Sequence, residues 1–314
     1  MKNRQLLFIL PIICSSHAFA SQPIYSYAQS PIHSNVLSLQ LRDSNALAPG
    51  SFEVKSSYNQ ASVWAETSDY FLDFYQNQAD IAILWQVNSR WKSEVGFKRI
   101  VARDNGLDEL THNFHDFFGI GQNGRDEVPQ DQFHISIPEL GIEINDFEGE
   151  TLTNALTSYN EYRFYSDTNH SLSAGFSIYY NFVNSGPFKR DSFEQGVQIN
   201  YSFRNEKHTF HSMLGVVNRS SSDIPNELLT KQAGMWAVGY NYAFNNKHSV
   251  IIESHNYSGW AESNDDFSEP SNEVVLGYRY SLERVALDFS MSENARNMDN
   301  STDIAFTIGL RFII

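Results

Sequence analysis

The feature that most constrains the fold is a regular alternation of apolar and polar side chains, repeated in long segments from about residue 50 to residue 314. In the last segment every second residue is apolar: Ile304, Phe306, Ile308, Leu310, Phe312 and Ile314. Successive side chains of a strand point to opposite faces of a sheet, so this period of two predicts strands with one apolar face. Membrane-spanning helices, which need about 20 consecutive apolar residues, are excluded from this part of the chain.

Two architectures produce such strands, and the length of the strands distinguishes them. Strands of a soluble sandwich have about 5 to 6 residues, whereas strands that cross a membrane have about 9 to 11. The alternating segments here run to ten or more residues, and their second face is rich in serine, glycine, asparagine and charged residues, as in 171–182. The lengths favour a transmembrane barrel, which turns its apolar face to lipid and encloses a polar lumen.

The connections between the segments support the same choice. In the second half of the chain, short links at 166–169, 205–207, 245–247 and 281–283 alternate with longer ones near 185–191, 219–231, 260–272 and 292–301. Outer-membrane barrels have short turns on one side and long loops on the other, whereas a sandwich has no reason for this alternation.

The predicted fold is an all-β, closed, antiparallel, up-and-down transmembrane barrel of twelve strands. The strands are expected at 51–65, 70–87, 91–101, 151–165, 170–184, 192–204, 207–218, 232–244, 247–259, 272–280, 284–292 and 302–314. A further hairpin at 132–144 would raise the count to fourteen, and either number is even, as closure requires when both termini lie on one side.

The N-terminal region predicts an exported protein. Lys2 and Arg4, the apolar run 6–13 and the small-residue site 18–20 match a signal peptide cleaved after Ala20. Cys14 is the only cysteine and lies inside this segment, preceded by an isoleucine that does not suit lipid attachment. The expected organisation is a signal peptide at 1–20, a periplasmic or lumenal arm at 21–50 and an outer-membrane barrel at 51–314.

Composition excludes other classes of protein. The chain of 314 residues has 22 Lys and Arg against 37 Asp and Glu, a net charge of −15, which argues against a nucleic-acid partner. Its aromatic fraction of 14% is too high for a disordered protein. The expected partners are outer-membrane lipid, lipopolysaccharide and, during insertion, the barrel assembly machinery; the oligomeric state is left open, and no cofactor motif is found.

Several stretches carry a family resemblance, most specifically 105–110, 115–120 and 122–125, together with 45–54 and 69–74. With these stretches the chain resembles a family of exported bacterial proteins, the domain of unknown function 3187. The resemblance runs over most of the chain after the predicted cleavage site, and it implies an outer-membrane barrel. It implies no activity and no functional residue.

The segment 102–130 departs from the period of two. Leu107, Leu110, Phe114 and Phe117 have helical spacing, so a short helix is expected in a long loop, which can fold into the lumen. Its other side carries possible metal ligands: Asp108, His112, His115 and Asp116. A metal site is one hypothesis, and a solvated acidic face is the favoured alternative because the sequence fixes no further ligand.

The polar faces of the strands supply candidates for the lumen lining. These are Glu161, Arg163, Glu194, Gln198, Asn200, Asn241, Glu273, Arg279, Asp288 and Arg311. Since charged side chains line many pores, they indicate a narrow or plugged channel for small polar solutes or ions. Asp288 between Arg279 and Arg311 could form a ladder across adjacent strands, or a salt-bridged filling of the lumen.

Two other functions are kept open. A structural or surface-interaction barrel could bind divalent cations and lipopolysaccharide through acidic loop residues, namely Glu262, Asp265, Asp266 and Glu269. A lipid hydrolase would need a serine beside a histidine, and the nearest set is Glu253, His255 and Ser258. Ser258 falls on the opposite face of a regular strand from His255, so no catalytic residue is assigned and an enzyme is not expected.

Overall fold

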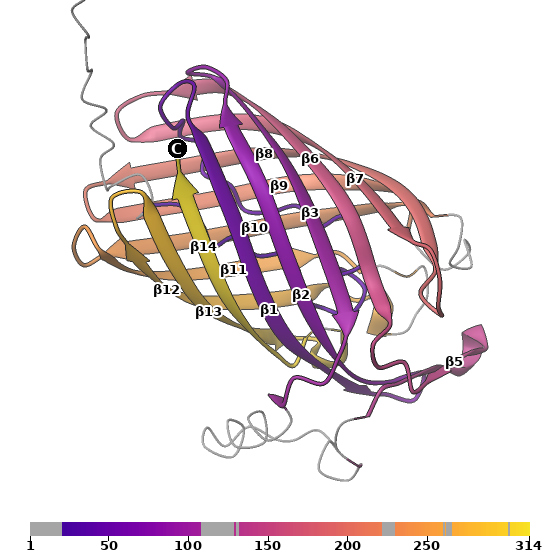
Figure 1. The fold of residues 1–314 in the computed structure, drawn as a ribbon. Helices are drawn as coiled ribbons and strands as arrows, with labels where there is room; N and C mark the ends of the chain where they lie inside the picture. The colour runs from indigo at the N-terminus through magenta and orange to yellow at the C-terminus, as the bar shows by residue number, and fades with distance from the viewer. Residues whose placement is uncertain are drawn as a thin grey trace, which may run out of the picture.

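Twelve long strands form a closed barrel in the computed structural model, which describes residues 21–107, 129, 132–221, 230–259, 261, 266–300 and 302–314 (Figure 1). The barrel strands are β1 (Phe52–Glu66), β2 (Phe71–Gln86), β3 (Trp91–Ala102), β6 (Thr151–Ser166), β7 (His170–Val183), β8 (Arg190–Asn205), β9 (His208–Ser221), β10 (Gln232–Ala243), β11 (His248–Tyr257), β12 (Ser271–Ser281), β13 (Val285–Arg296) and β14 (Ile304–Ile313). The predicted fold is confirmed, with strand ends that differ by a few residues. No helix in the described ranges is long and apolar enough to cross a membrane.

Closure comes from β1, which pairs with β2 on one side and with β14 on the other. The register between the first and last strands runs from Glu53 opposite Ile313 to Ser62 opposite Ile304. Because the ring is closed, every barrel strand has a hydrogen-bonded neighbour on both sides and no edge is exposed to lipid.

The two ends of the barrel differ in their connections. The turn end carries the C-terminus, the start of β1 and the short links 87–90, 167–169, 206–207, 244–247 and 282–284. The loop end carries the connections 103–150, 184–189, 222–231, 258–270 and 297–303, together with one short link at 67–70. The predicted alternation of short and long links therefore holds for the second half of the chain, and the link between β1 and β2 departs from it.

The extra hairpin forms but does not join the ring. β4 (His134–Ile137) and β5 (Ile142–Asn145) flank a short 3-10 turn, η2 (Pro138–Leu140), and β4 pairs with residues 71–73 of β2. β3 pairs directly with β6, so the ring closes without the hairpin. The expected alternatives of twelve and fourteen strands are thus resolved as a ring of twelve with two strands beside it.

The two faces of the strands have opposite chemistry. Ile308 and Leu310 of β14 point outward with 57% and 43% of their surface exposed, whereas Arg311 points into the barrel and is buried. The same outward apolar face recurs around the barrel, with exposed Val95, Ile199, Leu214 and Leu276 on other strands. Apolar side chains outside and charged ones inside are the arrangement of a barrel in lipid.

Aromatic side chains surround the turn end. His170, His208 and His248 begin β7, β9 and β11, and the Nδ1 atom of each lies 2.6–2.8 Å from a tyrosine hydroxyl, on Tyr201, Tyr240 and Tyr278 respectively. Exposed Trp85 and Trp91 lie at the same end. Since amphipathic aromatic rings prefer the boundary between lipid and water, this belt marks one membrane surface.

The loop end carries an apolar cluster. Phe74 of β2 packs against Phe147 of the segment before β6, with 5.7 Å between ring centroids. Tyr70 stacks on Phe267 of the 3-10 turn η3 (Asp266–Ser268), with 3.7 Å between centroids. Ile32, which precedes the barrel in the chain, packs against this cluster, so the loops and the N-terminal region meet here.

Candidate functional site: the occupied lumen

The lumen is occupied by residues 21–47 of the N-terminal region 21–50 expected from the sequence, and from here on these residues are called the arm. From Gly50 at the turn end the arm runs backwards along the lumen to a turn at 31–36 near the loop end, and then returns so that Ser21 again lies at the turn end. Most of its residues from Ser21 to Ser44 are buried. In Figure 1 the indigo trace of the arm is visible between the strands of the barrel.

The arm has no regular secondary structure, so its backbone groups need partners from elsewhere. Donors on the barrel wall supply them for its carbonyl oxygens. Arg279 Nη1 donates to Gln22 O at 2.7 Å, and Lys98 Nζ donates to Ser34 O at 2.6 Å. Further carbonyls accept hydrogen bonds from Gln76, Arg190, Asn181, Tyr179, Gln198, Lys92, Ser171 and Arg311.

Wall carboxylates bind backbone N–H groups of the arm. Glu253 accepts from Ile24 N at 2.8 Å, and Glu194 accepts from Leu37 N at 2.8 Å. Glu273 accepts from both Gln29 N and Ser30 N, each at 2.7 Å. Buried charges are costly unless hydrogen-bonded, so these contacts stabilise the wall as well as the arm.

An ion network joins the wall to the start of the arm. Asp288 lies between Arg279 and Arg311, with its oxygens 2.5 Å and 3.3 Å from the two Nε atoms, and Arg311 Nη1 also lies 3.0 Å from Glu53 Oε1. Both guanidinium groups also donate to the carbonyl of Pro23. The ladder that the sequence suggested is therefore present, and the arm is bound to it.

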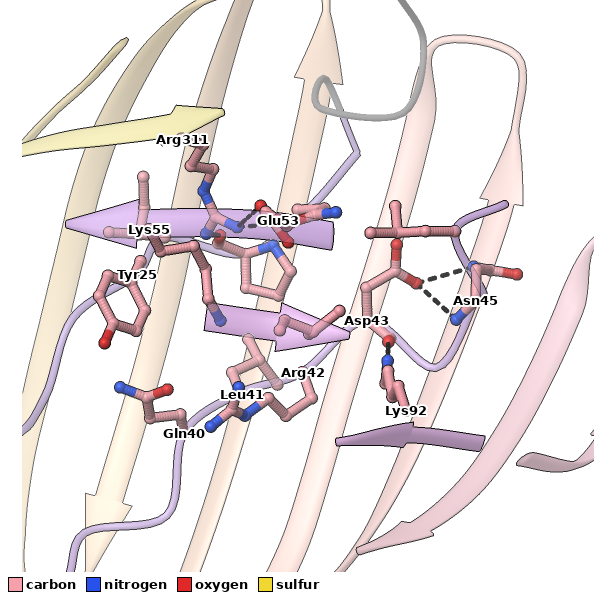
Figure 2. A pocket seen from close by; sticks show the side chains of 15 residues that line it. Tyr25, Gln40, Leu41, Arg42, Asp43, Asn45, Glu53, Lys55, Lys92 and Arg311 are labelled. Carbon is pink, nitrogen blue, oxygen red and sulfur yellow. Dashed lines mark hydrogen bonds and ion pairs between the residues drawn. The ribbon is translucent and has the colours of Figure 1, made fainter. Parts of the chain in front are cut away.

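A second group of ion pairs lies near Arg311 and Glu53. Glu94 binds both Lys55 and Arg42, the second at 2.9 Å, and Lys92 lies 2.9 Å from Glu161. Figure 2 shows Arg42, Lys55 and Lys92 around a cavity of about 40 Å³ between arm and wall. A cavity of that size has room for a few water molecules but not for passage of a solute.

The structure places the predicted lumen residues as follows. Nine are buried inside the barrel: Glu161, Glu194, Gln198, Asn200, Asn241, Glu273, Arg279, Asp288 and Arg311. Arg163 lies at the turn end instead, where a register shift separates it from Tyr165 and its guanidinium donates to Ser89 O. Arg163 is only partly buried there, since it lies near the end of β6.

The remaining candidates do not form a site in the described part of the chain. Asp108, His112, His115 and Asp116 lie outside the described residues, and so do Glu262 and Asp265 of the acidic loop. No group of three or more possible metal ligands occurs among the residues that the structure describes.

The proposed hydrolase set is divided between two environments. His255 Nε2 lies 2.8 Å from Glu253 Oε2 inside the lumen, and this pair borders the arm through Ile24. Ser258 follows the end of β11, and its hydroxyl accepts the N–H of Gly234. The serine and the histidine thus interact with different partners, Gly234 and Glu253 respectively.

Sequence reasoning expected the arm to be periplasmic or lumenal and did not identify its binding residues. The available signal was the alternation of Leu37, Leu39 and Leu41 within a stretch too short for a barrel strand. The contacts themselves join residues far apart in the chain, 64 positions for Ser34 and Lys98 and 157 for Leu37 and Glu194, so local pattern does not reveal them.

Comparison with known proteins identifies the family. The profile of the family described as "protein of unknown function (DUF3187)" matches residues 6–314. The chain belongs to the DUF3187 family. The comparison with curated proteins found no match.

Solved structures show that this DUF3187 chain shares its fold with outer-membrane barrels. The COG4313 outer membrane channel from Pseudomonas putida F1 is 13% identical, with a TM-score of 0.57 over 88% of this chain and 99% of that chain. The NanC porin is 11% identical, with a TM-score of 0.48 over 83% of this chain and 98% of that one. The first likeness establishes the architecture of the barrel.

Proposed function

We propose that the chain is an outer-membrane channel for small polar solutes or ions, and that the arm closes it in the conformation described. The observation that carries this proposal is the burial of the arm in a lumen whose wall is charged. A wall made only to enclose a permanent core could be apolar, whereas charged side chains suit a path that water and solutes enter. The apolar outer surface and the aromatic belt support a place in the membrane.

The path of the arm indicates how the channel opens. Both Ser21 and Gly50 lie at the turn end, so the arm is a loop inserted from that end alone. It can leave toward the turn end without threading past the apolar cluster at the loop end. Since outer-membrane barrels have their short turns on the periplasmic side, the gate opens to the periplasm.

Two variants of the full chain test the gate in planar lipid bilayers. Replacing Leu37, Leu39 and Leu41 by serine, which we call the arm-weakened variant, removes apolar contacts of the arm and leaves the wall unchanged. In the locked variant, Asn35→Cys is combined with Thr153→Cys, whose native side-chain oxygens lie 2.6 Å apart. The single Asn35→Cys chain is the matched control for the lock.

The arm-weakened variant should conduct more often and for longer than the native chain. The locked variant should be silent until a reductant opens the disulfide, whereas the single-cysteine control should not respond to reductant. Equal conductance of all four proteins, with folding verified by gel mobility, would contradict a gate formed by the arm.

A further inference from the structure

We propose that the lumen is a binding site for an extended peptide with aliphatic side chains at alternate positions, and that the arm occupies this site as an internal ligand. The inference rests on the proposed channel and adds a ligand that binds in its lumen. It follows from the two features of the arm that the wall contacts, namely the main chain and branched aliphatic side chains.

The first observation is that charged wall groups bind the backbone of the arm. Arg279 and Lys98 donate to carbonyl oxygens, and Glu194, Glu253 and Glu273 accept from N–H groups. Within 21–47 the arm itself has only Arg42 and Asp43 as charged side chains, apart from His33. Such contacts need no particular side chain on the ligand, so they suit any extended peptide of low charge.

The second observation is a series of glycines on the wall that receive alternate side chains of the arm. A methyl group at Gly196 would lie 2.8 Å from Cδ2 of Leu39, and one at Gly239 would lie 2.7 Å from Cδ2 of Leu41. Leu37 also borders Gly196, at 3.3 Å. The three leucines belong to the buried cluster that lines this side of the lumen.

The spacing of these pockets selects the ligand class. In an extended peptide, alternate side chains point to the same side, and backbone hydrogen bonds with pockets for every second side chain are a known mode of peptide recognition. A linear sugar could accept or donate the polar hydrogen bonds, but it has no branched apolar groups for the glycine pockets. The wall therefore favours a peptide over an oligosaccharide.

A similar pocket on the wall receives a side chain from the part of the arm before its turn at 31–36. Ile24 borders Gly277, where a methyl group would lie 2.8 Å from its Cδ1 atom, and its N–H binds Glu253. The parts of the arm before and after its turn are therefore held in the same way. In each, a backbone group binds a charged wall residue, and a nearby aliphatic side chain packs over a glycine. The repetition indicates a surface adapted to peptide chains along much of the lumen.

The test uses the full-length, arm-weakened variant in planar bilayers and in detergent solution. The probe is a peptide with blocked ends and the sequence of residues 35–43, and the matched control has the same composition with its three leucines adjacent. Maltohexaose serves as the sugar probe. Block of conductance and calorimetric binding are measured for each.

The probe peptide should block the channel at a concentration at least tenfold lower than the control peptide, and maltohexaose should not block it. In the same background, Gly239→Ala should raise the half-blocking concentration about tenfold because it fills a pocket. Gly234→Ala should not, since nothing lies within 4 Å of a methyl group there.

Equal block by both peptides, or stronger block by the sugar, would overturn the peptide site and leave the channel intact. A variant that never conducts would count against the channel, and calorimetry would still decide the site: tight binding of the probe over the control supports it, and equal binding overturns it. Folding of each variant is verified by gel mobility before and after heating.

Discussion

Single residues inside the barrel show how buried charge is tolerated. Asp288 is shared by Arg279 and Arg311, and all three side chains are buried. Asp288→Asn should lower the free energy of unfolding by about 3 kcal/mol, because breaking a buried ion pair leaves uncompensated charge. Urea unfolding in detergent measures this loss. Glu139→Gln, on the exposed turn η2, is the control and should leave the urea midpoint unchanged. An equal effect of both variants would contradict the stabilising role of Asp288.

A residue outside the membrane offers a prediction on pH. Asp167 accepts a hydrogen bond from the hydroxyl of Tyr165 at 2.6 Å and from the backbone N–H groups of His170 and Asn169. These hydrogen bonds, that of Tyr165 first, lower the pKa of Asp167 to about 2. Because the folded pKa is lowered, the stabilisation is present above the ordinary value near 4 and is lost as the pH falls toward 2.

Tyr165→Phe removes the largest cause, so the pKa of Asp167 should rise toward its ordinary value. Titration of the carboxyl carbon by NMR measures the midpoint. Tyr58→Phe, on the outward face of β1, is the control and should not move it. An unchanged midpoint in the Tyr165 variant would show that the turn N–H groups alone hold the carboxylate.

Pairing between elements depends on small residues as well as on hydrogen bonds. Gly175 of β7 leaves space for the ring of Tyr159 on β6, and a methyl group there would lie 2.5 Å from its Cζ atom. The hydroxyl of Tyr159 donates to Glu161 at 2.6 Å, and the centre of its ring lies 4.4 Å from the guanidinium carbon of Arg42 in the arm. The glycine thus positions a tyrosine that connects two strands with the arm.

Gly175→Ala should destabilise the barrel by about 1 to 3 kcal/mol, because overpacking displaces the tyrosine and its partners. The urea midpoint in detergent provides the measurement. Gly234→Ala is the matched control, since a methyl group there meets nothing within 4 Å. Unfolding midpoints that agree for the two variants would argue against this role of Gly175.

The whole molecule is held together by ring closure, and the arm contributes from within. Because β1 and β14 pair over ten residues, from Glu53 to Ser62, the closed barrel should resist detergent until heated. The native protein is therefore expected to change its gel mobility on heating. The arm-weakened variant should keep this change but at a lower temperature. A mobility that never changes in either protein would contradict a closed barrel.

Sequence alone determined the architecture because its signal is local. A strand with lipid on one side and a lumen on the other must alternate along its own length, so 304–314 reveals its faces without reference to any other segment. The period of two gives no sign of the register shift between Arg163 and Tyr165 near the end of β6. The hairpin at 134–145 was visible as alternation, but the direct pairing of β3 with β6 excluded it from the ring.

Only the tertiary structure decided what fills the lumen. The arm is a short stretch without regular structure, and its partners come from distant strands, as Gln22 shows with Arg279 and Leu37 with Glu194. Sequence alone determined that Arg279, Asp288 and Arg311 alternate with apolar residues. That these charges hold a peptide backbone follows only when ring closure brings the strands around the arm, because such contacts depend on distance in space and leave no period in the chain.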